Sequence, residues 1–418
     1  FWLKHLPQEG AGPGAAPGMR AWRGVLGGPL PLLLMMPLAA QRWTSERVRS
    51  WWASRSWRLG ANYLPASCGN PHELFDGVRF DEALVDVDRE LGLAGAVGFG
   101  AVRLFLHEEL YFRRGASFLN DLDQLVDVFA RRRLSVMLVL FDACWRPDLE
   151  GAQPIPGVHN SAWVQSPTHD VLRAFAAGET AATDRLRGYV VGVVGRFAGD
   201  SRVDIWDIYN EPSMRDSEHW ILPRLSAMHG WGGKHPAHWM LDGPKMQAAF
   251  KLLRSAFAWA REVAPTQPLT SAVWDFPSGE DSDDVAEFKR RTNDEILSLS
   301  DLVSLHCYCE PADLDARLSE LAALGRGPVL LTEFLARPRG SLLATSLPVL
   351  RRHGAWGYTW GLFRGRSQTH RSWDTWVRDD VPEDDEWFHD VFYENGSVYD
   401  PEEAKDIWWY THGHDLKL

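Results

Sequence analysis

The sequence predicts a single α/β domain built as a (β/α)8 TIM barrel, and three observations support this prediction. The chain has 418 residues, enough for one large barrel or two ordinary domains. From residue 42 onward, strand patterns and helix patterns alternate eight times. The strands are apolar throughout, as expected where helices cover both faces of a parallel sheet. A doubly wound open sheet is the alternative, but the chain has neither a GxGxxG nor a GxxxxGK[ST] phosphate turn.

Each strand–helix unit shows itself as a change in hydrophobic period. Near-continuous apolar runs favour buried strands, whereas apolar residues spaced three and four apart favour helices. Long loops rich in Trp, His and Pro follow the third and fourth strands. Strands are expected at residues 58–65, 99–107, 134–142, 203–210, 268–274, 301–308, 328–333 and 354–360. Helices are expected at residues 81–96, 118–133, 171–197 with a break near Gly178, 245–263, 285–299, 311–324, 341–353 and 401–410.

The composition excludes some classes of partner and favours another. The net charge of -12 argues against binding to nucleic acid or to an anionic membrane. The chain has 21 Trp residues, many of them in loops. An indole offers a flat apolar face and an N–H donor, which suits sugar rings. Trp206 and Trp259, which lie inside periodic segments, are instead expected to fill the core.

The first 41 residues differ from the rest of the chain. Met19 and two arginines precede an apolar run at residues 25–38 that ends in small residues, which resembles a signal peptide. We therefore expect residues 1–41 to be a leader that is disordered or removed, and residues 42–418 to be the barrel domain that carries the functional site. The signal-like residues 19–40 favour secretion, with a cytoplasmic protein as the alternative. No other segment is long and apolar enough to span a membrane.

The four cysteines, Cys68, Cys144, Cys307 and Cys309, show no zinc-site spacing. Cys307 and Cys309 are separated by one residue, which is too close for an easy disulfide. All four are therefore expected to be free thiols.

The carboxyl ends of barrel strands form the functional site, so the residues at these ends test the fold prediction. Pro212 ends the fourth strand because it cannot donate to a sheet ladder, and it disfavours the α region at Glu211. Nearly all the predicted strand ends are polar, titratable or aromatic: Asn62, Arg103 with His107 and Glu108, Asp142, Asn210 with Glu211, Trp274 with Asp275, His306 with Cys307 and Tyr308, Thr332 with Glu333, and Trp360.

Glu211 and Glu333 stand out because each terminates an otherwise apolar strand. Two carboxyl groups facing each other across a pocket suit the hydrolysis of glycosidic bonds. One carboxyl must be protonated and the other ionised. A neighbouring arginine should lower the pKa of Glu333, while burial and a nearby anion should raise that of Glu211. His306 stands without a His-x-His on the first strand, so neither a metal nor an organic cofactor is expected.

The chain from about residue 42 to its end resembles the retaining glycoside hydrolases of clan A, and looks closest to the cellulase-like barrels of family 5. The resemblance rests on residues at five strand ends: Asn210-Glu211-Pro212, His306-x-Tyr308, Glu333, Trp360 and Arg103. It implies that Glu211 is the general acid/base and Glu333 the nucleophile. It also implies that Asn210 contacts the 2-hydroxyl of the sugar, that Arg103 and Tyr308 bond to Glu333, that His306 lines the pocket, and that Trp360 forms its floor.

One departure from the family concerns the end of the third strand, where many family 5 enzymes have a histidine. This chain has Asp142-Ala143-Cys144-Trp145, and His107 or His159 would fill that space. Trp145 and Trp274 are further candidates for contact with sugar. Each of Arg103, His306 and Trp360 also has a purely structural interpretation, as a barrel ion pair, a buried histidine and a core residue.

The function expected from this resemblance is retaining hydrolysis of β-linked glycans or oligosaccharides of the glucan, xylan or mannan type. A transglycosylase on the same barrel and a non-catalytic sugar-binding barrel are the alternatives. The long loops rich in Trp and Arg after the third, fourth and eighth strands favour short substrates.

Overall fold

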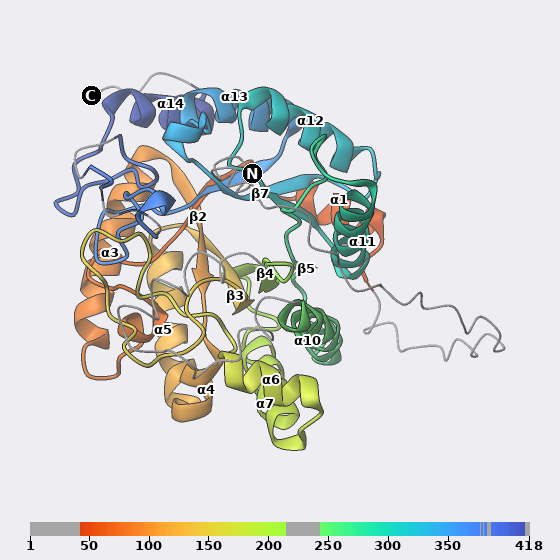
Figure 1. Ribbon diagram of the computed structural model, residues 1–418. Helices are drawn as coiled ribbons and strands as arrows, with labels where there is room; N and C mark the ends of the chain where they lie inside the picture. The colour runs from red at the N-terminus through yellow and green to blue at the C-terminus, as the bar shows by residue number, and fades with distance from the viewer. Residues whose placement is uncertain (1–41, 215–242, 377, 379, 383–385, 414–418) are drawn as a thin grey trace. The chain divides into compact units, whose positions relative to one another are not determined.

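The computed structural model describes residues 42–214, 243–376, 378, 380–382 and 386–413. In this part of the chain, eight parallel strands form one sheet in the order β5-β4-β3-β2-β1-β8-β7-β6, which confirms the predicted barrel (Figure 1). Beyond β5, Val273 bridges to Leu305 in parallel, so the two ends of the sheet meet. The strands are β1 (Leu59–Asn62), β2 (Phe99–Phe105), β3 (Ser135–Asp142), β4 (Val203–Asn210), β5 (Leu269–Thr270), β6 (Val303–His306), β7 (Val329–Phe334) and β8 (Trp356–Thr359).

The helices lie outside the sheet and pack on their neighbours (Figure 1). α3 packs on α5, α4 packs on α5 and α7, and α10 packs on α6 and α7. The last helix, α14, contacts both α13 and α3 and so joins the two ends of the helical layer. The helices are α1 (Ser45–Ala53), α2 (Pro71–Leu74), α3 (Phe80–Val97), α4 (Glu108–Arg114), α5 (Ala116–Arg131), α6 (His169–Ala177), α7 (Thr180–Arg196), α10 (Pro244–Glu262), α11 (Asp283–Leu299), α12 (Pro311–Ala322), α13 (Leu343–His353) and α14 (Pro401–His412).

The predicted elements differ from the observed ones mainly at their ends. The fifth strand is reduced to Leu269–Thr270, because the residues after it pair with β6 only through Val273. The predicted break at Gly178 is present, since this residue caps α6 with a φ of 85°. The helices α1, α2 and α4 were not predicted, and α4 starts so soon after β2 that the second strand ends at Phe105 rather than His107.

The amino-terminal end of the barrel is closed by α1. Trp43 and Val48 belong to a buried cluster with the inward side chains Ala101, Met137, Ile205, Leu302, Leu330, Trp356 and Tyr358. Trp52 packs on Trp356 with ring centroids 4.4 Å apart. Gly60 leaves the space that the Tyr358 ring fills, since a Cβ there would lie 2.4 Å from that ring. This apolar layer supports the polar layer above it.

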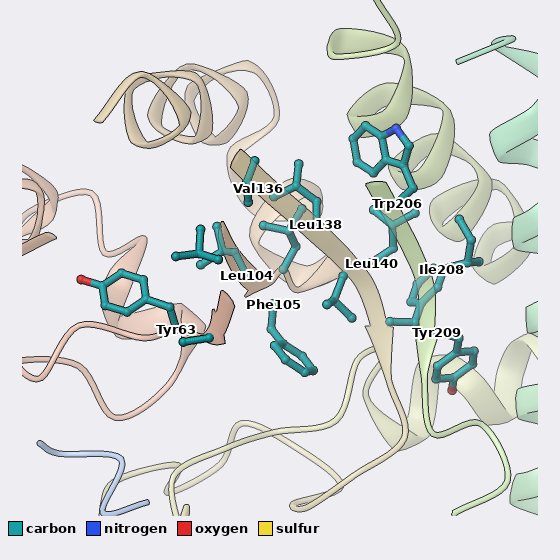
Figure 2. Packing of buried hydrophobic residues seen from close by; sticks show 14 of the residues in the cluster. Tyr63, Leu104, Phe105, Val136, Leu138, Leu140, Trp206, Ile208 and Tyr209 are labelled. Carbon is teal, nitrogen blue, oxygen red and sulfur yellow. The ribbon is translucent and has the colours of Figure 1, made fainter. Parts of the chain in front are cut away.

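A second, larger core lies between the sheet and the helices. Figure 2 shows Val136, Leu138 and Leu140 along β3 beside Trp206 and Ile208 of β4. Leu138 and Trp206 are register partners and both are fully buried. Trp206 and Trp259 are therefore core residues, as predicted, the latter being 9% exposed.

The prediction that Cys307 and Cys309 are free thiols is wrong, because the two residues form a disulfide. The chain turns directly after β6 and brings their Cα atoms to 5.2 Å, a distance that a disulfide spans. Cys68 and Cys144 are free, as predicted, and both are buried.

Two segments that the sequence singled out lie outside the described residues. They are the signal-like segment, residues 1–41, and residues 215–242 of the loop after β4. Among the helices that the structure describes, none has the length and hydropathy to cross a membrane.

Candidate active site

The two glutamates predicted from the strand ends lie close together at the carboxyl end of the barrel. Glu211 follows β4 directly, Glu333 lies near the end of β7, and a carboxylate oxygen of one lies within 4.8 Å of an oxygen of the other. Both side chains are buried, with 7% and 4% exposed. Carboxyl groups about 5–5.5 Å apart are typical of glycosidases that retain configuration, whereas inverting enzymes need about 6.5–9.5 Å to admit a water.

The backbone at Glu211 is unusual. Its φ of 47° lies in the left-handed region, which a residue with a side chain rarely adopts. Pro212 disfavours the right-handed α region at this position, and the turn closes through a hydrogen bond from the Met214 N–H to the Glu211 carbonyl, 2.8 Å long. Strain of this kind is often found at functional sites, where it aims a side chain.

His306, the last residue of β6, lies between the two carboxylates. Its Nδ1 is 2.7 Å from Glu211 Oε1 and 3.4 Å from Glu333 Oε2. Burial lowers the pKa of His306 to about 4, so the imidazole is neutral at neutral pH. Among the described residues, its Nε2 has no hydrogen-bond partner. A neutral ring whose Nδ1–H donates to Glu211 fits this geometry.

Arg103 of β2 organises the floor of the site from a fully buried position. Its guanidinium donates to Asn62 Oδ1 at 2.7 Å, Asp207 Oδ2 at 2.8 Å, Asn210 Oδ1 at 2.7 Å and Glu333 Oε1 at 2.8 Å. Burial alone would lower the pKa of Arg103, but the charges of Asp207 and Glu333 raise it. Arg103 therefore remains a cation and joins four strands around the predicted nucleophile.

Glu333 receives a second donor from Tyr308, whose hydroxyl donates to Oε2 at 2.7 Å. Arg103 lowers the pKa of Glu333, as predicted, but the net shift of this pKa is upward. Burial raises the pKa above its ordinary value, and the opposing effects of His306, Arg103 and Tyr308 offset this only in part. Because two strong donors nevertheless point at Glu333, the negative charge of the pair is best held there.

Glu211 accepts hydrogen bonds from weaker donors than Glu333 does, namely a thiol and a neutral imidazole. Burial raises its pKa to about 7, and the nearby charge of Asp275 also raises it, against the lowering effects of Cys144 and Arg103. At neutral pH a substantial fraction of Glu211 is therefore protonated. Glu211 can therefore give a proton, whereas Glu333, with its two strong donors, can carry negative charge.

Asp142 and Asn210 form a buried pair beside Glu211. Asn210 Nδ2 donates to Asp142 Oδ1 at 2.9 Å, and Trp163 Nε1 donates to Asp142 Oδ2 at 2.9 Å. Burial raises the pKa of Asp142 to about 6, although these donors and the Cys144 N–H lower it. Asp142 therefore orients the amide of Asn210, and both of its carboxylate oxygens are already hydrogen-bonded.

Cys144 is a site residue that sequence reasoning missed. Its thiol donates to Glu211 Oε2 with an S–O distance of 3.3 Å, and Asn210 Nδ2 lies 3.8 Å from the same sulfur. Cys144 lies two residues beyond the end of β3, in the stretch where the sequence departs from the family 5 pattern. That departure was the signal that could have identified it.

Aromatic side chains surround the polar groups. Trp360, 5% exposed, packs edge-on against Phe105 at 5.7 Å and lies 6.0 Å from Trp163 between ring centroids. A small cavity beside these three rings is also lined by Asn62. Trp360 thus borders a space in the barrel mouth while being largely covered.

The remaining aromatic candidates occupy different positions. Trp145 stacks on Trp376 with centroids 5.9 Å apart, and both Trp145 and Trp274 are half-buried. The Trp274 indole N–H has no hydrogen-bond partner among the described residues, so it is available to a ligand that reaches it.

The two histidines proposed for the third-strand space have structural contacts. His107 caps α4 by accepting from the Glu109 N–H at 3.2 Å, and its Nε2 lies 2.9 Å from the Gln165 carbonyl. His159 is fully buried, with Nδ1 2.8 Å from the Arg371 carbonyl. Neither has a contact with Glu211 or Glu333 among those found in the described residues, whereas Cys144 does.

Glu211, His306 and Glu333 also form a group of potential metal ligands, with one ligand atom from each within 4.8 Å of the others. Arg103 and Tyr308 already donate to the two oxygens of Glu333. A metal at this position would compete with an arginine cation for the same carboxylate. The hydrogen bonds of Glu333 to Arg103 and Tyr308 therefore weigh against a metal at this position.

A hollow of about 480 Å³ lies at the other end of the barrel, lined by residues that include Arg58, Phe99, Ser135 and Asp204. These residues precede or begin strands. That end of a barrel generally serves stability rather than chemistry.

Comparison with known proteins identifies the fold. No protein-family model matches the sequence, and no curated protein matches it either. Among solved structures, an exo-β-1,4-mannosidase from Opitutaceae bacterium strain TAV5 is 18% identical with a TM-score of 0.51, over 86% of this chain and 60% of that one. This chain therefore spans about three-fifths of the mannosidase.

Two further structures are covered more completely. A GH5_18 protein from Streptomyces cattleya, in complex with Manb1-4GlcNAc, is 16% identical with a TM-score of 0.54, over 86% of this chain and 82% of that one. A hyperthermophilic β-glucosidase from Pyrococcus furiosus is 13% identical with a TM-score of 0.53, over 87% of this chain and 96% of that one. At such low identity these similarities establish the (β/α)8 barrel as the shared fold.

Proposed function

We propose that this protein is a retaining β-glycoside hydrolase in which Glu211 is the general acid/base and Glu333 the nucleophile. The observation that carries the proposal is the pair of carboxylates, with oxygens within 4.8 Å at the carboxyl end of the barrel. Their environments differ in the way that double displacement requires. Glu333 is held by Arg103 and Tyr308, and Glu211 is buried beside a thiol and a neutral imidazole.

The first displacement forms a covalent intermediate. A Glu333 oxygen attacks the anomeric carbon while Glu211 gives its proton to the glycosidic oxygen, so that the C–O bond breaks and the aglycone leaves as an alcohol. Glu211 is then ionised. In the second displacement it takes a proton from a water that attacks the same carbon, and Glu333 departs as carboxylate. Two inversions give net retention.

Three neighbours support these steps. Arg103 and Tyr308 stabilise the Glu333 carboxylate before attack and after release. Asn210 is fixed by Arg103 and Asp142, and its Nδ2 also lies 3.8 Å from the Cys144 sulfur, so its amide is held in place beside the position proposed for the 2-hydroxyl of the sugar. No metal or organic cofactor takes part in this scheme.

The substrate we propose is a short β-linked oligosaccharide of the glucan, xylan or mannan type. The loops after β3 and β8 supply Trp145 and Trp376, which stack on each other and can wall the sugar site at one end. Among the structural neighbours, one is an exo-acting mannosidase, one is a β-glucosidase and one is a GH5_18 protein in complex with a disaccharide. These similarities favour terminal sugars over internal bonds. Hydrolysis of long polymer as fast as of aryl glycosides would contradict that part.

Chemical rescue with azide tests the two roles. A panel of β-linked aryl glycosides first identifies the sugar. In Glu333→Ala, azide can attack the anomeric carbon directly in one displacement, so the expected product is the α-glycosyl azide. In Glu211→Ala, an activated substrate still forms the glycosyl-enzyme and azide resolves it in a second displacement, so the expected product is the β-glycosyl azide.

The opposite pattern of azide products would show that the roles are reversed. An inverted product from the unmodified protein would overturn the retaining mechanism. Absence of turnover with every glycoside in the panel would favour the alternative of a non-catalytic sugar-binding barrel. Analysis of products at high substrate concentration separates hydrolysis from transglycosylation, because only transfer lengthens the oligosaccharide.

A further inference from the structure

The proposed mechanism assigns no role to Cys144, a buried side chain in contact with Glu211. Cys144 follows β3 and is 6% exposed. Its thiol donates to Glu211 Oε2 at 3.3 Å, on the oxygen that His306 does not contact. Asn210 Nδ2 donates to the same sulfur at a distance of 3.8 Å. The thiol therefore links the proposed acid/base to the residue assigned to the 2-hydroxyl.

The position of Cys144 is fixed by its backbone. Its N–H donates to Asp142 Oδ1 at 3.0 Å, the same oxygen that accepts from Asn210. The preceding residue is held on both sides, since the Ala143 N–H donates to the Asn210 carbonyl at 3.1 Å and Lys245 Nζ donates to the Ala143 carbonyl at 2.8 Å. A side chain anchored in this way holds one geometry relative to Glu211.

We propose that Cys144 is a positioning residue that adjusts the proton affinity of Glu211. Its S–H donates a hydrogen bond to Glu211 when Glu211 is ionised, and its sulfur accepts a hydrogen bond from Glu211 when Glu211 is protonated. This inference rests on the proposed roles of the two glutamates. It concerns a residue that contacts the proposed acid/base.

A thiol suits this position because it is a weak donor and a weak acceptor. When Glu211 is ionised, the S–H stabilises the anion without giving up its proton, because burial and the charge of Glu211 hold the pKa of Cys144 well above its usual range. When Glu211 is protonated, the sulfur can accept from Oε2. A stronger donor would favour the carboxylate, and an apolar side chain would favour the acid.

Other groups also face Glu211 and set the background for any pH effect. They are His306 on β6, Glu333 on β7, Arg103 on β2, Asp142 on β3, Asp275 after β5 and Tyr308 after β6. None of them is changed when Cys144 is replaced, so a shift of the Glu211 titration in such variants reports on the thiol.

The first experiment compares Cys144→Ala and Cys144→Ser by the pH dependence of kcat/KM on an aryl β-glycoside with a poor leaving group. Loss of the donor in Cys144→Ala should move the basic limb upward, and the stronger hydroxyl donor in Cys144→Ser should move it downward. Each shift should be about half a pH unit. Cys68→Ser, at the other free buried cysteine, is the matched control and should leave the limb unchanged.

The second experiment does not depend on activity. The infrared S–H stretch of Cys144, assigned by difference with Cys144→Ser, should shift as Glu211 titrates, with a midpoint near pH 7 in the unliganded protein. In Glu211→Gln the band should not change with pH. This measurement applies even if Cys144→Ala fails to fold.

The results separate the two levels of the argument. Limbs that stay in place, or that move in the same direction in both Cys144 variants, would overturn the role of the thiol, as would an S–H band independent of pH. If the glutamate variants retain full activity while the S–H band titrates, the proposed function fails and the contact between Cys144 and Glu211 stands.

Discussion

The pKa of Glu211 makes the proposed acid testable at the level of one residue. Burial raises this pKa to about 7, and the acid must be protonated, so kcat/KM should fall as pH rises through about 7. Glu211→Gln should remove this limb and slow substrates with poor leaving groups by about 10²–10⁴-fold. Substrates with good leaving groups do not need the proton and should lose far less. Equal losses for both classes would show that Glu211 is not the acid.

The same shift affects stability. The folded pKa of Glu211 lies above its ordinary value of 4.5, so the folded state binds this proton more tightly than the unfolded state. Its contribution to stability is therefore full below about pH 4.5 and lost as pH rises through about 7. Glu211→Gln should remove this loss, so its free energy of unfolding relative to the unmodified protein should rise by roughly 2 kcal/mol between pH 5 and pH 8.

Urea unfolding at the two pH values checks this prediction. Glu82→Gln, at an exposed position of α3, is the control and should show no such difference between pH values. A relative stability of Glu211→Gln that is independent of pH would mean that Glu211 has an ordinary pKa in the folded state.

At the scale of single residues, the sequence predicted site residues that lie at the ends of strands. It missed site residues that are recognisable only by their contacts with other strands. Glu211, Glu333, His306 and Tyr308 were predicted from polar side chains at the ends of apolar strands, whereas Arg103 lies within β2 and was predicted from the family resemblance. Asp207, which binds Arg103, and Cys144, which binds Glu211, were missed. Their partners lie 104 and 67 residues away in the chain, and only the register of the barrel brings them together.

At the scale of elements, Arg103 is the connection among four strands. From β2 it binds Asn62 of β1, Asp207 and Asn210 of β4, and Glu333 of β7. Removing one partner of a buried ion pair leaves the other charge uncompensated. Arg103→Met should therefore lower the free energy of unfolding by about 3–5 kcal/mol.

A double variant separates this penalty from simple loss of packing. In Arg103→Met/Asp207→Leu the orphaned Asp207 charge is gone as well, so part of the stability should return. Urea unfolding of the single and double variants measures the coupling. Additive losses would show that Asp207 and Arg103 do not depend on each other.

The elements themselves were predicted best where the pattern is long. β3, β4, α3 and α10 follow their predicted ranges closely because continuous apolar runs and amphipathic helices are unambiguous. α4 was missed because seven residues rich in charge carry little periodicity, and its start depends on the cap that His107 provides. The Cys307–Cys309 disulfide depends on a turn after β6 that sequence separation alone does not reveal.

At the scale of the whole molecule, the barrel has a catalytic end and a structural end. Trp43 anchors the chain before α1 through its backbone N–H, which donates to Asp301 Oδ1 at 2.7 Å. α1 then covers the barrel floor with Val48, Trp51 and Trp52. Glu211 and Glu333 both lie at the carboxyl end of the barrel, away from α1. Substitutions at one end of the barrel should therefore have little effect on the other end.

Two truncations test this division and the proposed domain boundary. A chain beginning at Arg42 keeps α1 and should retain the melting temperature and kcat/KM of the full chain. A chain beginning at Trp57 lacks α1 and exposes Trp356, so its melting temperature should fall by several degrees, while kcat/KM measured well below that temperature should change little. Trp52→Ala in the Arg42 chain isolates the stacking on Trp356 and should give part of the same loss. Differential scanning calorimetry measures all three: equal melting temperatures for both truncations would mean that α1 adds no stability, and a loss on removing residues 1–41 alone would place that segment within the folded unit.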